Sequence, residues 1–343
     1  MASTPQRAPV IRPLSRSRAV APHVSVVVVN FCQWRNTDRL TRQLLDSDAA
    51  DAQIAEFVVV DNASPPDPAA ARVRRLPGLS LRQFDRNTGF ARAANEGVRM
   101  ARGEWALLLN PDTAVPEGFL DQLEALCRTL DHDDPRVGVV GLALRHADGS
   151  PQGSCGPMPT LARTLGGLFL PRRLRKCRPV AADDRVPVDW VTGCGMLIRR
   201  DCWADLGGFD EAFFLYYEDA DFCRRAAAAG WSVWFEPTLW LTHFKPLHTR
   251  QVPPEMRLMT RHALLTFAGK HWGGWRSRLI SAVVWLEAVA RQAVATARCR
   301  PSSLAGELRR LAADWLWNQP AAARRRVLQT SILLTSCAGR EDG

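Results

Sequence analysis

The sequence predicts an α/β protein with a mostly parallel central sheet and a helical C-terminal extension. Apolar runs such as VSVVVVN (24–30) are continuous rather than alternating, which is typical of strands buried on both faces of a sheet. These runs alternate with helical segments, as in open parallel sheets built from β-α-β units. From residue 255 onward, apolar positions recur at three- and four-residue spacing and predict helices at 255–297 and 303–335.

The remaining elements follow from local patterns in chain order. Strands are expected within the segments 57–61, 79–84, 105–113, 137–144, 190–200 and 231–244. Helices are expected at 36–47, in a short helix or turn at 68–76, within 86–103, at 118–130, and from Glu218 to a glycine cap at Gly230.

Polar side chains stand at the carboxyl ends of three predicted strands. Asn30 ends the first strand, Asp61 the second and Asp112 the fourth. In open parallel sheets, ligands bind beyond the carboxyl ends of the strands. The sequence therefore predicts one shared site there.

The glycine pattern excludes the common nucleotide-binding loops. Neither G-x-G-x-x-G nor a Walker lysine motif follows the first strand. The charge of a bound nucleotide would then have to be met in another way. A divalent cation held by Asp112 would do this, because hard cations take oxygen ligands.

A cluster of acids, Glu218, Asp219 and Asp221, directly follows the apolar run AFFLYY (212–217). Carboxylates at the edge of an apolar wall have perturbed proton affinity, as a catalytic base requires. The alternative is that the acids only cap the helix that they begin. Asp221 is expected to be structural, near the helix start.

Charge and cysteine content limit the partners and the compartment. Residues 245–343 carry 16 Lys and Arg against 6 Asp and Glu, which accounts for the net charge of +10. Such a surface attracts nucleic acid or an anionic membrane face. No run reaches the ~18 uncharged apolar residues that span a bilayer. Nine cysteines without a C-x-x-C pair favour a reducing cytoplasm.

Two basic segments have open interpretations. Residues 1–22 are predicted to be a disordered basic arm, with an organelle transit peptide as the alternative. The run PRRLRKCRP (171–179) is predicted to be a solvated loop, or a flap that contacts an anionic substrate.

Six segments together resemble the inverting family 2 glycosyltransferases of the GT-A fold, especially rhamnosyltransferase-like members. They are VSVVVVNF, VVVDNAS, RNTGFARAANEGV, LLLNPDT, the block from Gly193 to Trp231 and THFK, in the family's order. The resemblance covers about residues 24–245. It implies a catalytic domain at 23–248, followed by a basic helical region at 249–343 that either packs on that domain, forms an oligomer contact or touches a membrane.

The resemblance also implies roles for individual residues. The donor nucleotide-sugar pocket would be formed by Asn30, Asp61, Asn62, Arg86, Asn87, Gly89, Asn110 and Asp112. Arg86 suits a diphosphate because its planar guanidinium binds oxyanions bidentately. Asn110 stands where the family's metal-binding D-x-D motif has its first acid. Asp112 and His243 would hold Mg²⁺ or Mn²⁺.

In the catalytic step that the resemblance implies, Asp219 is the base, and Glu218 raises its proton affinity by repulsion. Trp190, Gly193 and Gly195 would lie on the acceptor side. The implied activity transfers a sugar, with dTDP-L-rhamnose as the best candidate donor, to a saccharide or lipid-linked acceptor for cell-envelope polysaccharide. The alternatives are another hexosyltransferase using a UDP- or GDP-sugar, or a nucleotidyltransferase. A nucleic-acid partner is not expected, and peripheral contact with the inner face of the plasma membrane stays open.

Overall fold

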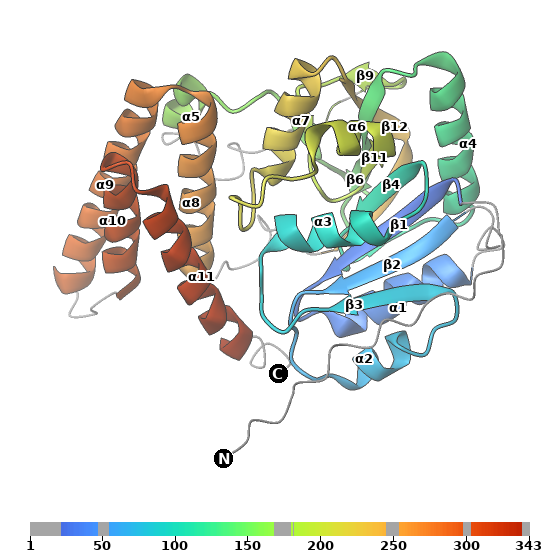
Figure 1. Ribbon diagram of the computed structural model, residues 1–343, viewed down its shortest axis with the longest axis horizontal. Helices are drawn as coiled ribbons and strands as arrows, with labels where there is room; N and C mark the ends of the chain where they lie inside the picture. The colour runs from blue at the N-terminus through green and yellow to red at the C-terminus, as the bar shows by residue number, and fades with distance from the viewer. Residues whose placement is uncertain are drawn as a thin grey trace.

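The computed structural model describes residues 22–46, 55–167, 180, 182–244, 254–297 and 303–337. A sheet domain with helices on both faces lies beside a bundle formed by the C-terminal helices (Figure 1). The predicted arm lies outside the described residues except for Pro22, and the basic run 171–179 lies wholly outside them.

The first half of the sheet is parallel, as predicted. Its spatial order is β3 (Leu79–Gln83), β2 (Ala55–Asp61), β1 (Val24–Asn30) and β4 (Trp105–Leu109). Every residue of β1, β2 and β4 is buried, which explains the continuous apolar runs.

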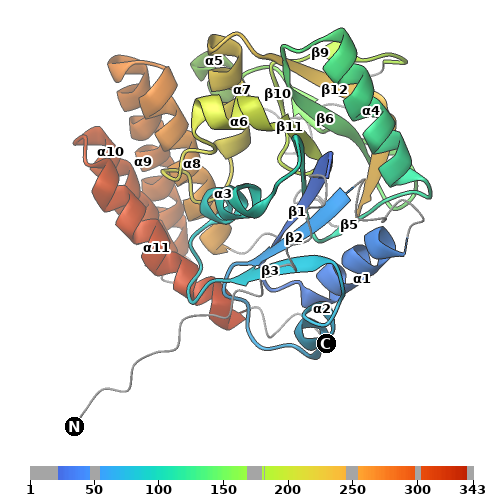
Figure 2. The same cartoon turned by 45° about the vertical axis from the view of Figure 1, so that its right-hand side comes forward.

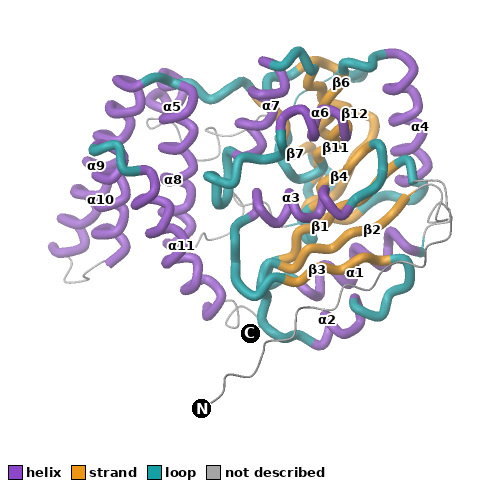
Figure 3. Tube along the Cα trace, viewed as in Figure 1, coloured by secondary structure: helices purple, strands orange, loops and turns teal. Residues whose placement is uncertain are grey.

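The second half contains a strand of opposite direction. β11 (Met196–Arg199) lies antiparallel between β4 and β6 (Val137–Arg145), and β12 (Ser232–His243) runs parallel to β6. β5 (Thr113–Ala114) pairs with the end of β12, while β7 (Pro151–Gln152) pairs antiparallel with β6 and β9 (Val186–Pro187) antiparallel with β12. Figure 3 shows the strands as one twisted layer.

The single strand expected at 190–200 is wrong. β10 (Trp190–Val191) pairs with β8 (Cys155–Gly156) in a separate two-stranded sheet, and the chain enters β11 only at Met196. Between them Gly195 has φ 78°, a conformation that breaks a strand and that glycine adopts without strain.

Helices cover the two faces of the sheet separately. α1 (Trp34–Leu45) and α4 (Phe119–Asp133) pack on one face. α3 (Phe90–Met100), α6 (Arg200–Leu206) and α7 (Glu218–Ala228) pack on the other. α2 (Pro68–Val73) lies beside α1, and α5 (Leu161–Gly167) lies toward the bundle (Figure 2).

The bundle consists of α8 (Pro254–His271), α9 (Gly274–Ala297), α10 (Ser303–Leu316) and α11 (Pro320–Cys337). The prediction of two long helices is therefore wrong, because each is broken once. The breaks fall where Gly273 has φ 81° and Asn318 has φ 55°, conformations that end a helix. By length and composition α9 is able to cross a membrane, a property that the sequence-based threshold missed.

The bundle shares a core with the segment that leads into α7. Phe213, Phe214 and Ala220 are buried together with residues of all four bundle helices, among them Phe267 and Leu311. The C-terminal helices therefore form part of the structure that supports the predicted catalytic segment.

The cysteines near the acidic motif are buried thiols. Cys194, Cys202 and Cys223 are free and buried. Burial raises the pKa of each thiol, to about 12 for Cys202, so none is an activated nucleophile.

Candidate active site

Asn30 and Asp61 lie side by side at the ends of β1 and β2. Asn30 Nδ2 donates to Asp61 Oδ1 at 2.7 Å, and the Asn30 side-chain oxygen accepts from Thr37 Oγ1 at 2.9 Å. Both side chains are fully buried. Two predicted donor-pocket residues are thus brought together in a satisfied polar pair.

Asp61 also holds the loop that follows β2. Its Oδ2 accepts from Gln83 Nε2 at 2.9 Å and from the Ser64 backbone N–H at 3.2 Å. Burial raises the pKa of this carboxyl, and the bonds from Ser64, Asn30 and Gln83 oppose that shift. In this structure the buried Asp61 carboxylate therefore holds Asn30, Ser64 and Gln83 in place through hydrogen bonds.

A cavity of about 170 Å³ opens beyond Ser64 and Gln83. Its wall includes Trp34, residues 65–67, residues 70–71 and Arg74. Arg74 Nη2 donates to Gln83 Oε1 at 2.7 Å. Sequence analysis missed this cavity, because its lining comes from α1, α2 and β3 and follows no contiguous motif.

The segment 86–90 is held against both the strand ends and the chain that leads to α7. Asn62 Nδ2 donates to Asn87 Oδ1 at 2.8 Å and to the Gly89 carbonyl at 3.2 Å. The Phe90 N–H donates to the Phe214 carbonyl at 2.7 Å. Gly89 has φ 91°, and a Cβ there would overlap that same carbonyl oxygen, so this contact requires glycine.

Arg86 stands apart from this network. Its side chain is exposed, and no hydrogen bond or ion pair joins it to any residue that the structure describes. The fold therefore does not hold the Arg86 guanidinium in place.

Asp112 and His243 meet across the β5–β12 pairing. Asp112 Oδ1 lies 3.5 Å from His243 Nε2, and both side chains are buried. The Phe244 N–H donates to the Asp112 carbonyl at 3.0 Å, which fixes the two segments together. Asn110 is half-buried, and its carbonyl accepts from Thr113 Oγ1 at 2.7 Å. The fold therefore brings the two predicted metal ligands together.

Gln152 supports His243 from behind. Its Nε2 lies 2.9 Å from His243 Nδ1, while its Oε1 is buried with no hydrogen-bond partner among the described residues. Turning the Gln152 amide by 180° would let its Oε1 accept a hydrogen bond from His243 Nδ1–H. The lone pair of the other ring nitrogen, His243 Nε2, would then face Asp112. An imidazole that binds a divalent cation is oriented in this way, so the residues present fit a metal.

Asp219 stands in the first turn of α7, at a glycine loop. Its Oδ2 accepts from the Gly193 N–H at 3.2 Å, and its Oδ1 accepts from the Ala220 N–H at 2.8 Å. Cys194 directly follows Gly193 and hydrogen-bonds to the backbone of Asn110. Burial, and then the charge of Asp112, raises the pKa of its thiol. One short loop thus contacts both Asp219 and the Asn110–Asp112 turn.

Glu218 differs sharply from Asp219 in its surroundings. It is 4% exposed, and its Oε2 has no hydrogen-bond partner among the described residues. Burial, followed by the charge of Asp219, raises its pKa well above the ordinary value. Repulsion from Asp219 therefore adds to burial in favouring the protonated form of Glu218.

Asp221 is structural, as predicted. It is fully buried and accepts from Arg225 at 2.8 Å and from His271 and Lys270 of α8 at 2.7 and 2.8 Å. Burial opposes ionisation, but these bonds outweigh it and lower the pKa of Asp221 to about 2.

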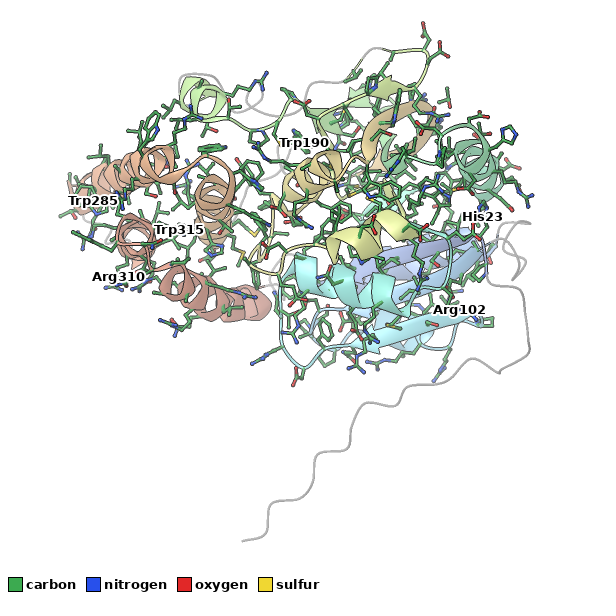
Figure 4. All side chains as sticks on the ribbon, turned by 45° about the horizontal axis from the view of Figure 1, so that its top comes forward. His23, Arg102, Trp190, Trp285, Arg310 and Trp315 are labelled. Atoms are coloured by element: carbon green, nitrogen blue, oxygen red, sulfur yellow. The ribbon has the colours of Figure 1, made fainter. Side chains whose placement is uncertain are left out.

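The predicted acceptor-side residues separate into two groups. Trp190 is half-buried between the sheet domain and the bundle (Figure 4), and its Nε1 donates to the Pro157 carbonyl at 3.0 Å. Gly193 touches Asp219, whereas Gly195 lies within the sheet, where a Cβ would strike Leu241. Gly195 therefore serves packing and does not line the acidic site.

A second cluster of possible ligands lies at the opposite edge of the sheet. His23, Glu104 and Asp131 gather before β1 and β4. Asp131 is already bonded to Arg199 at 2.6 Å and to His23 at 2.8 Å, so it serves as an ion-pair centre there.

Comparison with known proteins supports the resemblance. The family described as "Glycosyltransferase like family 2" matches residues 21–263. An N-acetylglucosaminyl-diphospho-decaprenol L-rhamnosyltransferase from Mycobacterium tuberculosis is 31% identical over 279 residues, covering 74% of this chain and 87% of that protein.

Two solved structures are similar in fold. The mannosyltransferase PcManGT from Pyrobaculum calidifontis, in complex with GDP-Man and Mn²⁺, has a TM-score of 0.50 at 20% identity, covering 97% of this chain and 92% of the other. GalNAc-T7 with UDP, GalNAc and Mn²⁺ has a TM-score of 0.52 at 16% identity, covering 70% of this chain and 47% of the other. These similarities confirm the predicted GT-A fold.

Proposed function

This chain belongs to glycosyltransferase family 2, and we propose that it transfers L-rhamnose from dTDP-L-rhamnose to a hydroxyl of a lipid-linked saccharide, with inversion at the anomeric carbon. The observation that carries the proposal is the loop at Gly193 and Cys194, which joins Asp219 to the Asn110–Asp112 turn. Through these two contacts, the loop connects the acid that would take a proton with the turn that would hold the donor's diphosphate.

Asp219 suits the role of base by its exposure and its contacts. It is half-buried, so an acceptor hydroxyl is able to reach it, and the Gly193 N–H holds its carboxylate in one orientation. Asp219 accepts the hydroxyl proton while the acceptor oxygen forms a bond to the anomeric carbon. The bond from that carbon to the phosphate oxygen breaks at the same time, and the nucleoside diphosphate leaves with the electron pair.

Donor binding is assigned to the strand ends and to segment 86–90. Asn62 and Gly89 shape the wall, and Asn30 and Asp61 fix the strand ends that carry it. The exposed guanidinium of Arg86 is free to turn toward a diphosphate. Asp112 and His243 would hold Mg²⁺ or Mn²⁺, which supplies positive charge to the leaving diphosphate when bound.

The relatives support the proposed sugar and acceptor. The M. tuberculosis relative is named for rhamnosyl transfer to a diphospho-decaprenol-linked sugar. A hexosyltransferase from Haloferax volcanii is 26% identical over 59% of this chain and 61% of that protein, which keeps other hexoses as the alternative. Work on a lipid-linked acceptor would place the enzyme at the cytoplasmic face of the membrane.

A donor panel tests the proposal. The full chain is incubated with dTDP-L-rhamnose, UDP-sugars and GDP-sugars, with Mn²⁺ and a short-chain lipid-linked acceptor, and released nucleoside diphosphate is measured. We expect the largest release with dTDP-L-rhamnose and a loss of ~100- to 10,000-fold in Asp219→Asn. Release from a UDP- or GDP-sugar alone would replace the donor, and no release from any donor would contradict the activity.

A further inference from the structure

One face of α9 is apolar along its whole length and is left uncovered by the bundle. At spacings of three and four residues it presents Trp275, Leu279, Ala282, Leu286, Ala290, Ala293 and Ala297. Trp275 is 66% exposed and Leu286 is 60% exposed. This α9 stripe extends ~33 Å at 1.5 Å per residue, much more than scattered surface leucines would cover.

The opposite face of α9 is committed to the bundle. Ile280, Val284 and Ala288 are buried there, and Glu287 Oε2 lies 2.8 Å from Arg261 of α8. The helix therefore lies along the bundle with one side outward. This packing is that of a helix that rests on a surface, although its composition would allow it to span a membrane.

Positive charge lies beside one end of the α9 stripe. The acids of α9–α11 are already paired with arginines: Glu287 with Arg261 and Arg291, Glu307 with Arg310, and Asp314 with Arg326. Two exposed arginines of α9 itself, Arg276 and Arg278, form no ion pair with any acid in the described part of the chain.

Two tryptophans mark one end of the bundle. These are Trp275, at the start of α9, and Trp317, which lies just after the end of α10 and is 78% exposed. The two ends lie together because Trp315, in the last turn of α10, packs on Gly269 near the end of α8, and α9 begins directly after α8. Arg276 lies over the Trp275 ring at 5.3 Å. Tryptophan beside arginine is typical of the boundary between lipid head groups and acyl chains.

We propose that the α9 stripe, with Trp275, Trp317 and the exposed arginines around them, docks on an anionic phospholipid bilayer. The apolar side chains enter the upper acyl region, and the arginines meet lipid phosphates. A second copy of this chain fits less well, because two such faces would bring like charges together. The inference deepens the proposed function, since a lipid-linked acceptor must be met at a membrane, but its test does not need that function.

The test is sedimentation of the full chain with phosphatidylglycerol–phosphatidylcholine vesicles and with phosphatidylcholine alone. The double variant Leu279→Gln/Leu286→Gln is compared with Leu328→Gln on α11. Leu328 is a matched control because it is exposed, while α9 and α11 lie on opposite sides of the α8–α10 pair. All these side chains are at least partly in solvent, so unchanged melting temperatures verify that the variants fold.

We expect wild type and Leu328→Gln to bind anionic vesicles, with weaker binding at high salt, and the double variant to bind at least ~10-fold more weakly. No binding by wild type, or equal binding by the double variant, overturns the inference. A wild-type dimer that the double variant dissociates, without vesicle binding, also overturns it and assigns the α9 stripe to a second copy. Nucleoside diphosphate release with a water-soluble acceptor is measured in parallel and should be unchanged in the double variant. If neither wild type nor any variant releases nucleoside diphosphate, while wild type still binds vesicles, only the proposed function is contradicted.

Discussion

His271 Nε2 on α8 lies 2.7 Å from Asp221 Oδ1 on α7, two residues beyond Asp219. The bond joins the C-terminal bundle directly to the helix that carries the proposed base. Lys270 reinforces it at 2.8 Å from the same oxygen and also pairs with Asp210 at 2.7 Å. The position of Asp219 therefore depends on residues more than fifty positions downstream.

Removing the carboxylate of Asp221 should destabilise the protein. Asp221→Ala leaves His271, Lys270 and Arg225 without a fully buried partner, and breaking such a pair costs about 3–5 kcal/mol. Chemical denaturation measures the change, and sugar transfer should fall as α7 loosens. Exposed Asp183→Ala is the control and should stay within about 0.5 kcal/mol of wild type. Equal stability of the two variants would show that the ion pairs do not hold α7.

Amide substitution should affect the transfer rate very differently at Glu218 and at Asp219. Because burial and the charge of Asp219 raise the pKa of Glu218 and favour its uncharged form, Glu218→Gln should keep both charge and shape, and transfer should stay within about threefold of wild type. Asp219→Asn removes the base and should lose ~100-fold or more. Initial rates with the same donor decide between them. A Glu218→Gln enzyme as inactive as Asp219→Asn would move the role of base to Glu218.

Gln152 should tune the affinity of the site for metal. In Gln152→Leu, His243 Nδ1 loses its partner, and Mn²⁺ binding should weaken by ~10- to 100-fold. Calorimetric titration of Mn²⁺ in the presence of nucleoside diphosphate measures this without catalysis. Gln152→Glu keeps an acceptor for Nδ1–H and should retain affinity. If the leucine variant binds Mn²⁺ as wild type does, Gln152 has no part in the site.

The bundle should lose stability in mild acid. Burial, and then the charge of Arg324, lowers the pKa of His262 to about 4, whereas the unfolded chain takes up this proton near pH 6.5. The unfolded state binds the additional proton between these values, so lowering the pH from about 6.5 to 4 costs up to ~3 kcal/mol. His262→Leu should show a shallower loss in thermal melts at pH 7 and pH 5. An identical loss in both proteins would assign the acid sensitivity to other groups.

Local sequence patterns predicted the parallel strands and the positions of Asn30, Asp61 and Asp112, because buried strands and their polar ends are contiguous in the chain. The insertion of β11 in the opposite direction was missed, since pairing direction depends on partners distant in sequence. Gln152 was missed for the same reason, because it acts on His243 across 91 residues. The two bundle helices were predicted unbroken because their apolar spacing continues past Gly273 and Asn318, where only the backbone conformation reveals the turns.

The antiparallel direction of β11 determines how well the hydrogen bond that holds Asp219 tolerates substitution. Parallel strands finish at this edge, whereas the chain enters β11 here, so the loop before it offers a main-chain amide, that of Gly193, to the carboxylate. This anchor belongs to the backbone, and a Cβ at Gly193 would come no closer than 3.4 Å to the Phe90 ring. Substitution of Gly193 can therefore leave the backbone hydrogen bond to Asp219 intact. Proline alone among the standard amino acids would abolish it, because it has no backbone N–H.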